Sequence, residues 1–203
     1  MKRQDKIELL VLYATGGGST AGIADIIAQQ YRDVANVTVH RLKREHSNWP
    51  DPSRFDAVIA GSAIRYDRWL PQMTEYIRRN EVKLAHRPVA FFFSCLSLAG
   101  GESGRHQAET YAGKIQNLVG YEPLEIQGFA GTLNYNSIPM WIRLPFRIGM
   151  KIKGLKEGDY RDPDAIRLWA NGLKARIISG KNPYQVKKGQ PVNHPPEKSP
   201  ASI

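Results

Sequence analysis

Five apolar runs alternate with segments of helical periodicity, and this alternation limits the fold more than any other feature of the chain. Ile7–Tyr13 is apolar almost throughout, as expected of a strand covered on both faces, whereas Asn36–Leu42 alternates more, as expected nearer a sheet edge. The other predicted strands are 55–61, 88–94 and 124–130, and the predicted helices are 20–32, 69–80, 106–119 and 163–178. The pattern predicts an α/β fold with a five-stranded parallel sheet, wound by helices on both faces.

The 203 residues suffice for one sizeable core, and two full domains would be cramped. We therefore expect one domain over residues 1–180, whose last helix begins with an N-cap at Asp162 and a first-turn proline at Pro163. The proline-rich crossover 43–54 is expected to be irregular or only briefly helical. Beyond the domain, 181–203 is poor in apolar residues, which predicts a disordered basic tail.

A glycine-rich segment with three hydroxyl residues joins the first predicted strand to the first helix: Thr15-Gly16-Gly17-Gly18-Ser19-Thr20. Glycines let backbone N–H groups approach a phosphate, hydroxyls add donors, and the helix N-terminus adds a favourable dipole. The segment contains no lysine, which excludes a triphosphate P-loop, and its spacing does not fit the dinucleotide-binding motif Gly-x-Gly-x-x-Gly. It predicts a site for a phosphomonoester such as FMN; the alternative is a tight turn that binds nothing.

This segment resembles the phosphate loop of the flavodoxins, whose usual form is Thr-x-Thr-Gly-x-Thr. Gly17 departs from that form, because it stands where the family has a hydroxyl residue that bonds the phosphate. The resemblance implies a flavodoxin-like sheet of strand order 2-1-3-4-5, with FMN as the cofactor. In sheets of this kind, ligands bind outside the carboxyl ends of the strands, where the winding reverses.

The loops after the third and fourth predicted strands are expected to hold the flavin ring. Tyr66 or Trp69 could cover one face of the ring. Arg65 is either a solvated surface cation or a charge that stabilises reduced flavin or recruits a substrate carboxylate. Cys95, the only cysteine, is expected to be a small buried residue rather than a redox participant, and no metal site is expected. The predicted cofactor contacts in these loops are Ser62, Ala63, Ile64, Arg65, Tyr66, Ser94, Cys95, Leu96 and Ser97.

The net charge of +10 is concentrated in two short segments. Residues 141–157 carry five basic side chains against one acid, and the tail 181–203 carries four against one. Localised charge points to an anionic partner surface, either lipid head groups or nucleic acid. The alternative is that the basic residues serve solubility.

The connection 131–162 between the fifth strand and the last helix is far longer than is usual inside a compact domain. Its apolar residues recur at helical spacing, and basic residues repeat every four positions on a different face. A basic amphipathic segment of this kind suits a membrane surface; the alternative is an extra helix packed on the domain. Pro145 is expected to break or kink this helix. The apolar positions are Trp141, Leu144, Ile148, Ile152 and Leu155, and the basic ones are Arg143, Arg147 and Lys151.

Gly61-Ser62-Ala63-Ile64-Arg65-Tyr66, together with the insertion and Gly158–Asp162, resembles the bacterial quinone-dependent protoporphyrinogen oxidases, a flavodoxin-like family of haem biosynthesis. The resemblance implies FMN-dependent oxidation of protoporphyrinogen IX, with a membrane quinone as the acceptor. It further suggests substrate contacts at Arg65, Tyr66, Arg143 and Arg147. We expect a cytoplasmic protein on the inner face of the cell membrane, with an anionic membrane surface and no nucleic acid among its partners.

Three other functions remain open on the sequence. A flavodoxin-type electron carrier usually presents an acidic surface, so the charge of +10 argues against it. An FMN-dependent NAD(P)H:quinone reductase needs no second nucleotide motif and is compatible with the loops. A flavodoxin-like module that binds a partner without flavin is disfavoured by the intact loop chemistry.

Overall fold

The computed structural model describes residues 6–135, 140–152 and 155–179. Five parallel strands form the central sheet in the order β2-β1-β3-β5-β6. This arrangement confirms the α/β prediction and the predicted order of the five strands. The strands are β1 (Ile7–Ala14), β2 (Ala35–Arg41), β3 (Ala57–Arg65), β5 (Val89–Cys95) and β6 (Glu125–Ala130).

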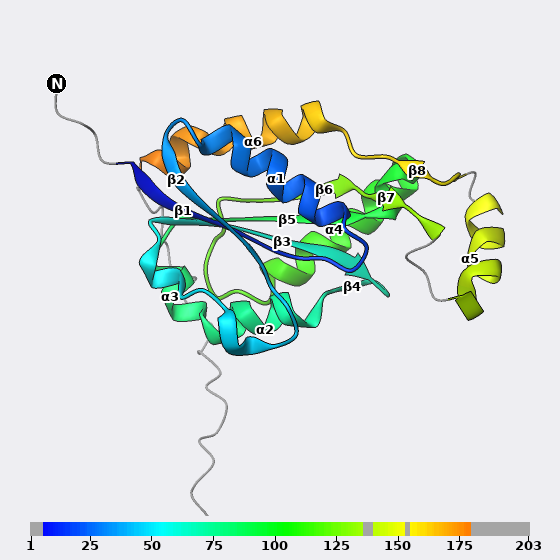
Figure 1. The fold of residues 1–203 in the computed structure, drawn as a ribbon, viewed down its shortest axis with the longest axis horizontal. Coiled ribbons are helices and arrows are strands. Elements are labelled where there is room, and N and C mark those ends of the chain that lie inside the picture. Colours follow the sequence, from blue (N-terminus) through cyan, green and yellow to red (C-terminus); the bar gives the residue numbers. More distant parts are fainter. Residues whose placement is uncertain (1–5, 136–139, 153–154, 180–203) are drawn as a thin grey trace, which may run out of the picture.

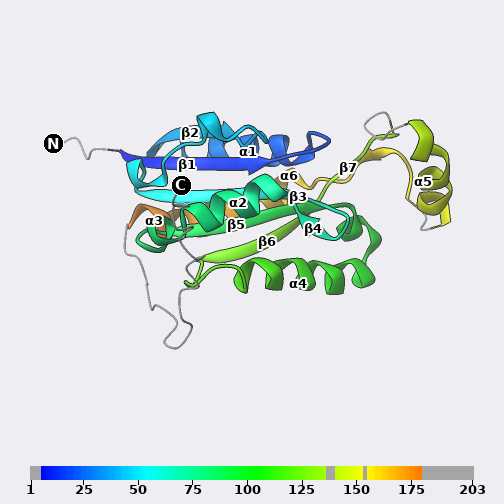
Figure 2. The ribbon, with the colours of Figure 1, turned by 90° about the horizontal axis from the view of Figure 1, so that it is seen from below.

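Helices cover both faces of the sheet (Figures 1 and 2). One face packs against α1 (Ser19–Tyr31) and α6 (Pro163–Ile178). The other packs against α2 (Pro71–Arg79), α3 (Glu81–Ala85) and α4 (Glu102–Gln116). Because successive side chains of a strand point to opposite faces, the phenylalanines of β5 divide between the two cores. Phe92 packs on Trp169 of α6, whereas Phe91 and Phe93 pack on Trp69.

Local signals explain several element boundaries. The Asp162 carboxylate accepts the N–H groups of Asp164 and Ala165, each at 3.0 Å, which confirms the predicted N-cap of α6. The crossover after β2 forms two single-turn 3-10 helices, His46–Asn48 and Pro52–Arg54, as its prolines predict.

The insertion begins and ends in a short antiparallel ribbon, β7 (Thr132–Leu133) with β8 (Gly158–Asp159). Between these strands, α5 (Met140–Ile152) lies apart from the helices that cover the sheet, as both views show (Figures 1 and 2). Of the two outcomes expected at Pro145, a break or a kink, the break is wrong, because the helix continues through this residue. Because proline has no backbone N–H, the helix lacks one hydrogen bond at Pro145, the one to the carbonyl of Trp141 in the first turn.

Some of the sequence predictions fall outside the described residues, among them the tail 181–203. Within the described ranges, no helix is both long and apolar enough to cross a bilayer.

Candidate functional site

The glycine-rich segment forms a nest of backbone donors at the carboxyl end of β1. Gly18 adopts the left-handed region with φ of 96°, and its N–H donates to Thr15 Oγ1 at 2.9 Å. The other N–H groups of segment 16–20 have no hydrogen-bond partner in the described part of the chain. Unpaired N–H groups in such a turn, at the start of the 13-residue α1, suit an anion.

The hydroxyl groups of the loop do not all face the nest. Thr20 is fully buried, and its Oγ1 lies 2.8 Å from Ser94 Oγ. This contact corrects the expectation that all three hydroxyls are available to a phosphate, because the Thr20 hydroxyl ties α1 to β5. Thr15 accepts a bond from Gly18 and keeps its own proton to donate, and Ser19 is half-buried at the helix start.

Arg65 places a positive charge against the same loop. A Cβ on Gly16 would stand 3.1 Å from Arg65 Nη1, so the guanidinium lies directly over the glycine backbone. Arg65 is exposed, yet this contact distinguishes it from an isolated surface cation. The loop therefore combines free N–H donors with an adjacent cation.

A tight turn after β3 carries Tyr66 outward. Tyr66 and Asp67 have φ of 49° and 57°, which is unfavourable for non-glycine residues by roughly 1–3 kcal/mol each. The turn is held because the Asp67 carboxylate accepts bonds from the Tyr111 hydroxyl at 2.5 Å and from Gln107 Nε2 at 3.1 Å. Burial and this bond raise the pKa of Tyr111. The Tyr66 side chain is 81% exposed and free to cover a flat ligand.

Two other residues predicted in this region are structural. Trp69 lies in β4 (Arg68–Trp69), is buried, and donates Nε1 to the Tyr111 carbonyl at 2.9 Å. It cannot cover a ring, so that alternative is wrong. Ser62 is also fully buried; its Oγ donates to the Ala63 carbonyl at 2.9 Å and accepts the Leu70 N–H at 3.0 Å.

The loop after β5 is the other loop in which contacts to the ring are expected. Cys95 is 5% exposed and burial raises the pKa of its thiol, which confirms the prediction of a small buried residue. Leu96–Gly100 forms a 3-10 turn in which Leu96 and Ser97 are half-buried. A Cβ on Gly104 would stand 1.8 Å from the Ser97 carbonyl oxygen, so α4 starts in close contact with this loop.

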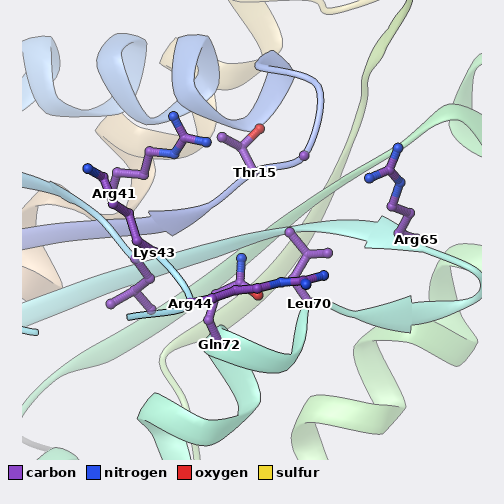
Figure 3. Close-up of a pocket in the computed structure, with 9 residues that line it drawn as sticks. Thr15, Arg41, Lys43, Arg44, Arg65, Leu70 and Gln72 are labelled. Atoms are coloured by element: carbon purple, nitrogen blue, oxygen red, sulfur yellow. The ribbon is translucent and has the colours of Figure 1, made fainter. Parts of the chain in front are cut away.

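A pocket of about 250 Å³ lies beside the glycine-rich loop (Figure 3). Thr15, Gly16 and Arg65 line it, so the structure brings these predicted residues together. It does not bring Arg143 or Arg147 into this pocket. The residues that complete the lining were not predicted. The basic ones lie at the end of a predicted strand or directly after it, and this position places them at the carboxyl edge of the sheet. The residues that complete the lining are Arg41, Leu42, Lys43, Arg44, Leu70 and Gln72.

Comparison with known proteins gives similar enzymes and similar folds. The chain is 28% identical to a protoporphyrinogen IX dehydrogenase (quinone) of Leishmania major over 171 residues, which cover 82% of this chain and 74% of that enzyme. It is 28% identical to the enzyme of the same name from Escherichia coli K12 over 154 residues, which cover 73% of this chain and 81% of that enzyme.

Solved flavodoxins share the fold at low sequence identity. The flavodoxin of Fusobacterium nucleatum bound to flavin mononucleotide aligns with 84% of this chain and 99% of its own, at 12% identity and a TM-score of 0.53. A short-chain flavodoxin associated with a bacterial microcompartment aligns over the same shares, at 13% identity and a TM-score of 0.50. The flavodoxin domain model matches residues 10–159, about three quarters of the chain, and the chain therefore belongs to the flavodoxin domain family.

Proposed function

We propose that the protein is an FMN-dependent oxidoreductase that oxidises protoporphyrinogen IX to protoporphyrin IX and passes the electrons to a membrane quinone. The observation that carries the proposal is the nest of unpaired N–H groups in segment 16–20, with the Arg65 guanidinium against it. A lysine-free nest of this size fits the phosphate of a mononucleotide. The relatives named for this reaction support the substrate and the acceptor.

In this proposal the phosphate is held by the N–H groups of the nest and by the hydroxyls of Thr15 and Ser19. When bound, FMN supplies two-electron chemistry: it accepts a hydride equivalent from the substrate and returns electrons to the quinone. Three such steps remove six electrons and six protons from one porphyrinogen, and three quinones leave as quinols. With FMN bound, Arg65 would stabilise negative charge that develops on the flavin, and the exposed Tyr66 side chain would be available to cover the ring.

The insertion supports a peripheral position on an anionic membrane. Four large apolar side chains on α5 face solvent, with exposed fractions of 81% for Met140, 82% for Trp141, 68% for Leu144 and 54% for Ile148. Exposed Arg147 and Lys151 lie on the same helix. The side chains that face solvent are those expected to insert if the helix lies at a membrane surface, where the quinone resides.

The activity test uses the full-length protein loaded with FMN, under anaerobic conditions, with protoporphyrinogen IX and a soluble quinone. Protoporphyrin fluorescence should rise only when FMN and quinone are both present. A second reaction replaces the porphyrinogen with NADPH. Rapid quinone reduction by NADPH, with no porphyrin formed in the first reaction, would establish the reductase function instead.

A further inference from the structure

The charged side chains that line the pocket beside the phosphate loop are all positive. Arg41, Lys43, Arg44 and Arg65 line it, and no acidic residue does. None of the four makes an ion pair with another described residue. A cleft lined by charges of one sign concentrates the field and attracts ions of the opposite sign. Four unpaired cations repel one another, so their grouping favours a ligand rather than the stability of the empty chain.

A second observation at the same place indicates an unfilled site. The Oε1 atom of Gln72 is buried and has no hydrogen-bond partner among the described residues. Buried polar groups in folded proteins are nearly always paired, and an exception calls for a missing partner. Because the oxygen and nitrogen of a glutamine amide exchange places by rotation, the Gln72 side chain can present its NH₂ group to an anion.

The pocket overlaps the expected flavin site only in part. It shares Thr15, Gly16 and Arg65 with that site, yet no residue of the loop after β5 lines it. The shared residues come from the carboxyl ends of β1 and β3. The others come from the last residue of β2, the segment that follows it, and the N-cap and first turn of α2 (Figure 3). A ligand in the pocket would therefore lie beside the bound phosphate, on the side away from β5.

The size of the pocket limits what it can hold. Sites that enclose a whole drug-sized ligand measure roughly 300–1,000 Å³, whereas this pocket measures about 250 Å³. It therefore suits one acidic arm of a larger molecule, and the rest of the molecule would extend over the neighbouring loops.

We propose that Arg41, Lys43, Arg44 and Gln72 form a second oxyanion site, which anchors a carboxylate or phosphate arm of the redox partner next to the flavin. This inference rests on the proposed function, since it assigns a specificity site to that reaction. Two ligands could supply such an oxyanion: a porphyrin, through its propionate carboxylates, and NADPH, through its 2′-phosphate. The arginine forks favour either group.

The test measures binding to the FMN-loaded full-length protein, in which the phosphate loop is already filled. Protoporphyrin IX and its dimethyl ester are titrated in parallel by flavin fluorescence, and NADPH is compared with NADH. The pocket variant is Arg41→Gln/Arg44→Gln. The control is Arg54→Gln, which removes an exposed charge from the 3-10 turn before β3 that does not line the pocket. FMN affinity and urea stability of each variant are measured first.

We expect the wild type to bind either protoporphyrin IX more tightly than its dimethyl ester, or NADPH more tightly than NADH. The difference in affinity should be at least about tenfold, because charge-assisted bonds contribute roughly 1.5–3 kcal/mol each. The pocket variant should lose this preference, whereas Arg54→Gln should keep it; both variants should still bind FMN, and neither should be less stable in urea than the wild type. A preference for protoporphyrin assigns the site to carboxylates, and a preference for NADPH assigns it to phosphates. Equal binding within both ligand pairs, or equal losses in the two variants, would overturn the site. Failure of the wild type to bind FMN would refute the proposed function before any ligand is added.

Discussion

Removing two apolar side chains from α5 should release the protein from anionic membranes. Leu144 and Ile148 expose 68% and 54% of their surfaces on one side of the helix. Truncation of each to alanine removes three carbons, and each buried CH₂ contributes about 0.8 kcal/mol. Scaled by the exposed fractions, full insertion of both side chains would contribute about 3 kcal/mol, and half-insertion about half of that.

Such a loss corresponds to about a ten- to hundredfold fall in the partition coefficient. The assay is flotation of the FMN-loaded protein with vesicles of phosphatidylcholine and phosphatidylglycerol. A matched variant, Val82→Ala/Leu168→Ala, truncates side chains that are 64% and 77% exposed on α3 and α6. It should partition like the wild type. Equal loss from both double variants, or no loss from Leu144→Ala/Ile148→Ala, would refute the assignment of α5 to the membrane.

Two further predictions concern stability. Gly18→Ala should lower the free energy of unfolding by about 1 kcal/mol or more, because φ of 96° disfavours a side chain although the space is open. Gly172→Ala in α6, also in open space, should raise the free energy of unfolding by about 0.5–1 kcal/mol in urea titrations. Destabilisation by Gly172→Ala, or no effect of Gly18→Ala, would contradict the backbone conformations assigned to these two glycines. Hydrogen bonds from Ser53, and then Lys83, lower the pKa of Asp51 to about 2, so this carboxylate stabilises the fold above its unfolded pKa of about 4. The stabilisation is lost as pH falls from about 4 to 2. Asp51→Asn should therefore make the free energy of unfolding depend less on pH across that interval. An equally steep pH dependence in the variant would exclude Asp51 as its source.

The regular elements of this fold could be predicted because their signals are local. Ile7–Tyr13 is apolar along its whole length, and Asp162-Pro163 is a helix start in almost any context. The two-residue strands β4, β7 and β8 could not be predicted, since a pair of residues shows no periodicity. The helical spacing instead places Trp69 in the following helix, which begins only at Pro71.

The chemistry of the candidate site was only partly predictable. The order of glycines and hydroxyls indicates an anion nest, but it does not show that Thr20 turns inward to Ser94, 74 residues later in the chain. The basic pocket depends in the same way on distant segments, because Arg41 and Gln72 meet only through the pairing of β2, β1 and β3. The exposure of Trp141 likewise depends on α5 standing apart from the sheet, which spacing alone cannot fix.

The proposed function depends above all on the nest in segment 16–20 holding the phosphate of FMN. The most direct measurement is a calorimetric titration of the flavin-free, full-length protein with FMN, and in parallel with riboflavin, which lacks the phosphate. FMN should bind at one per chain and about a hundredfold or more tightly than riboflavin, because several charge-assisted bonds depend on that group. Equal affinity for the two flavins, or no binding of FMN, would contradict this role of the nest.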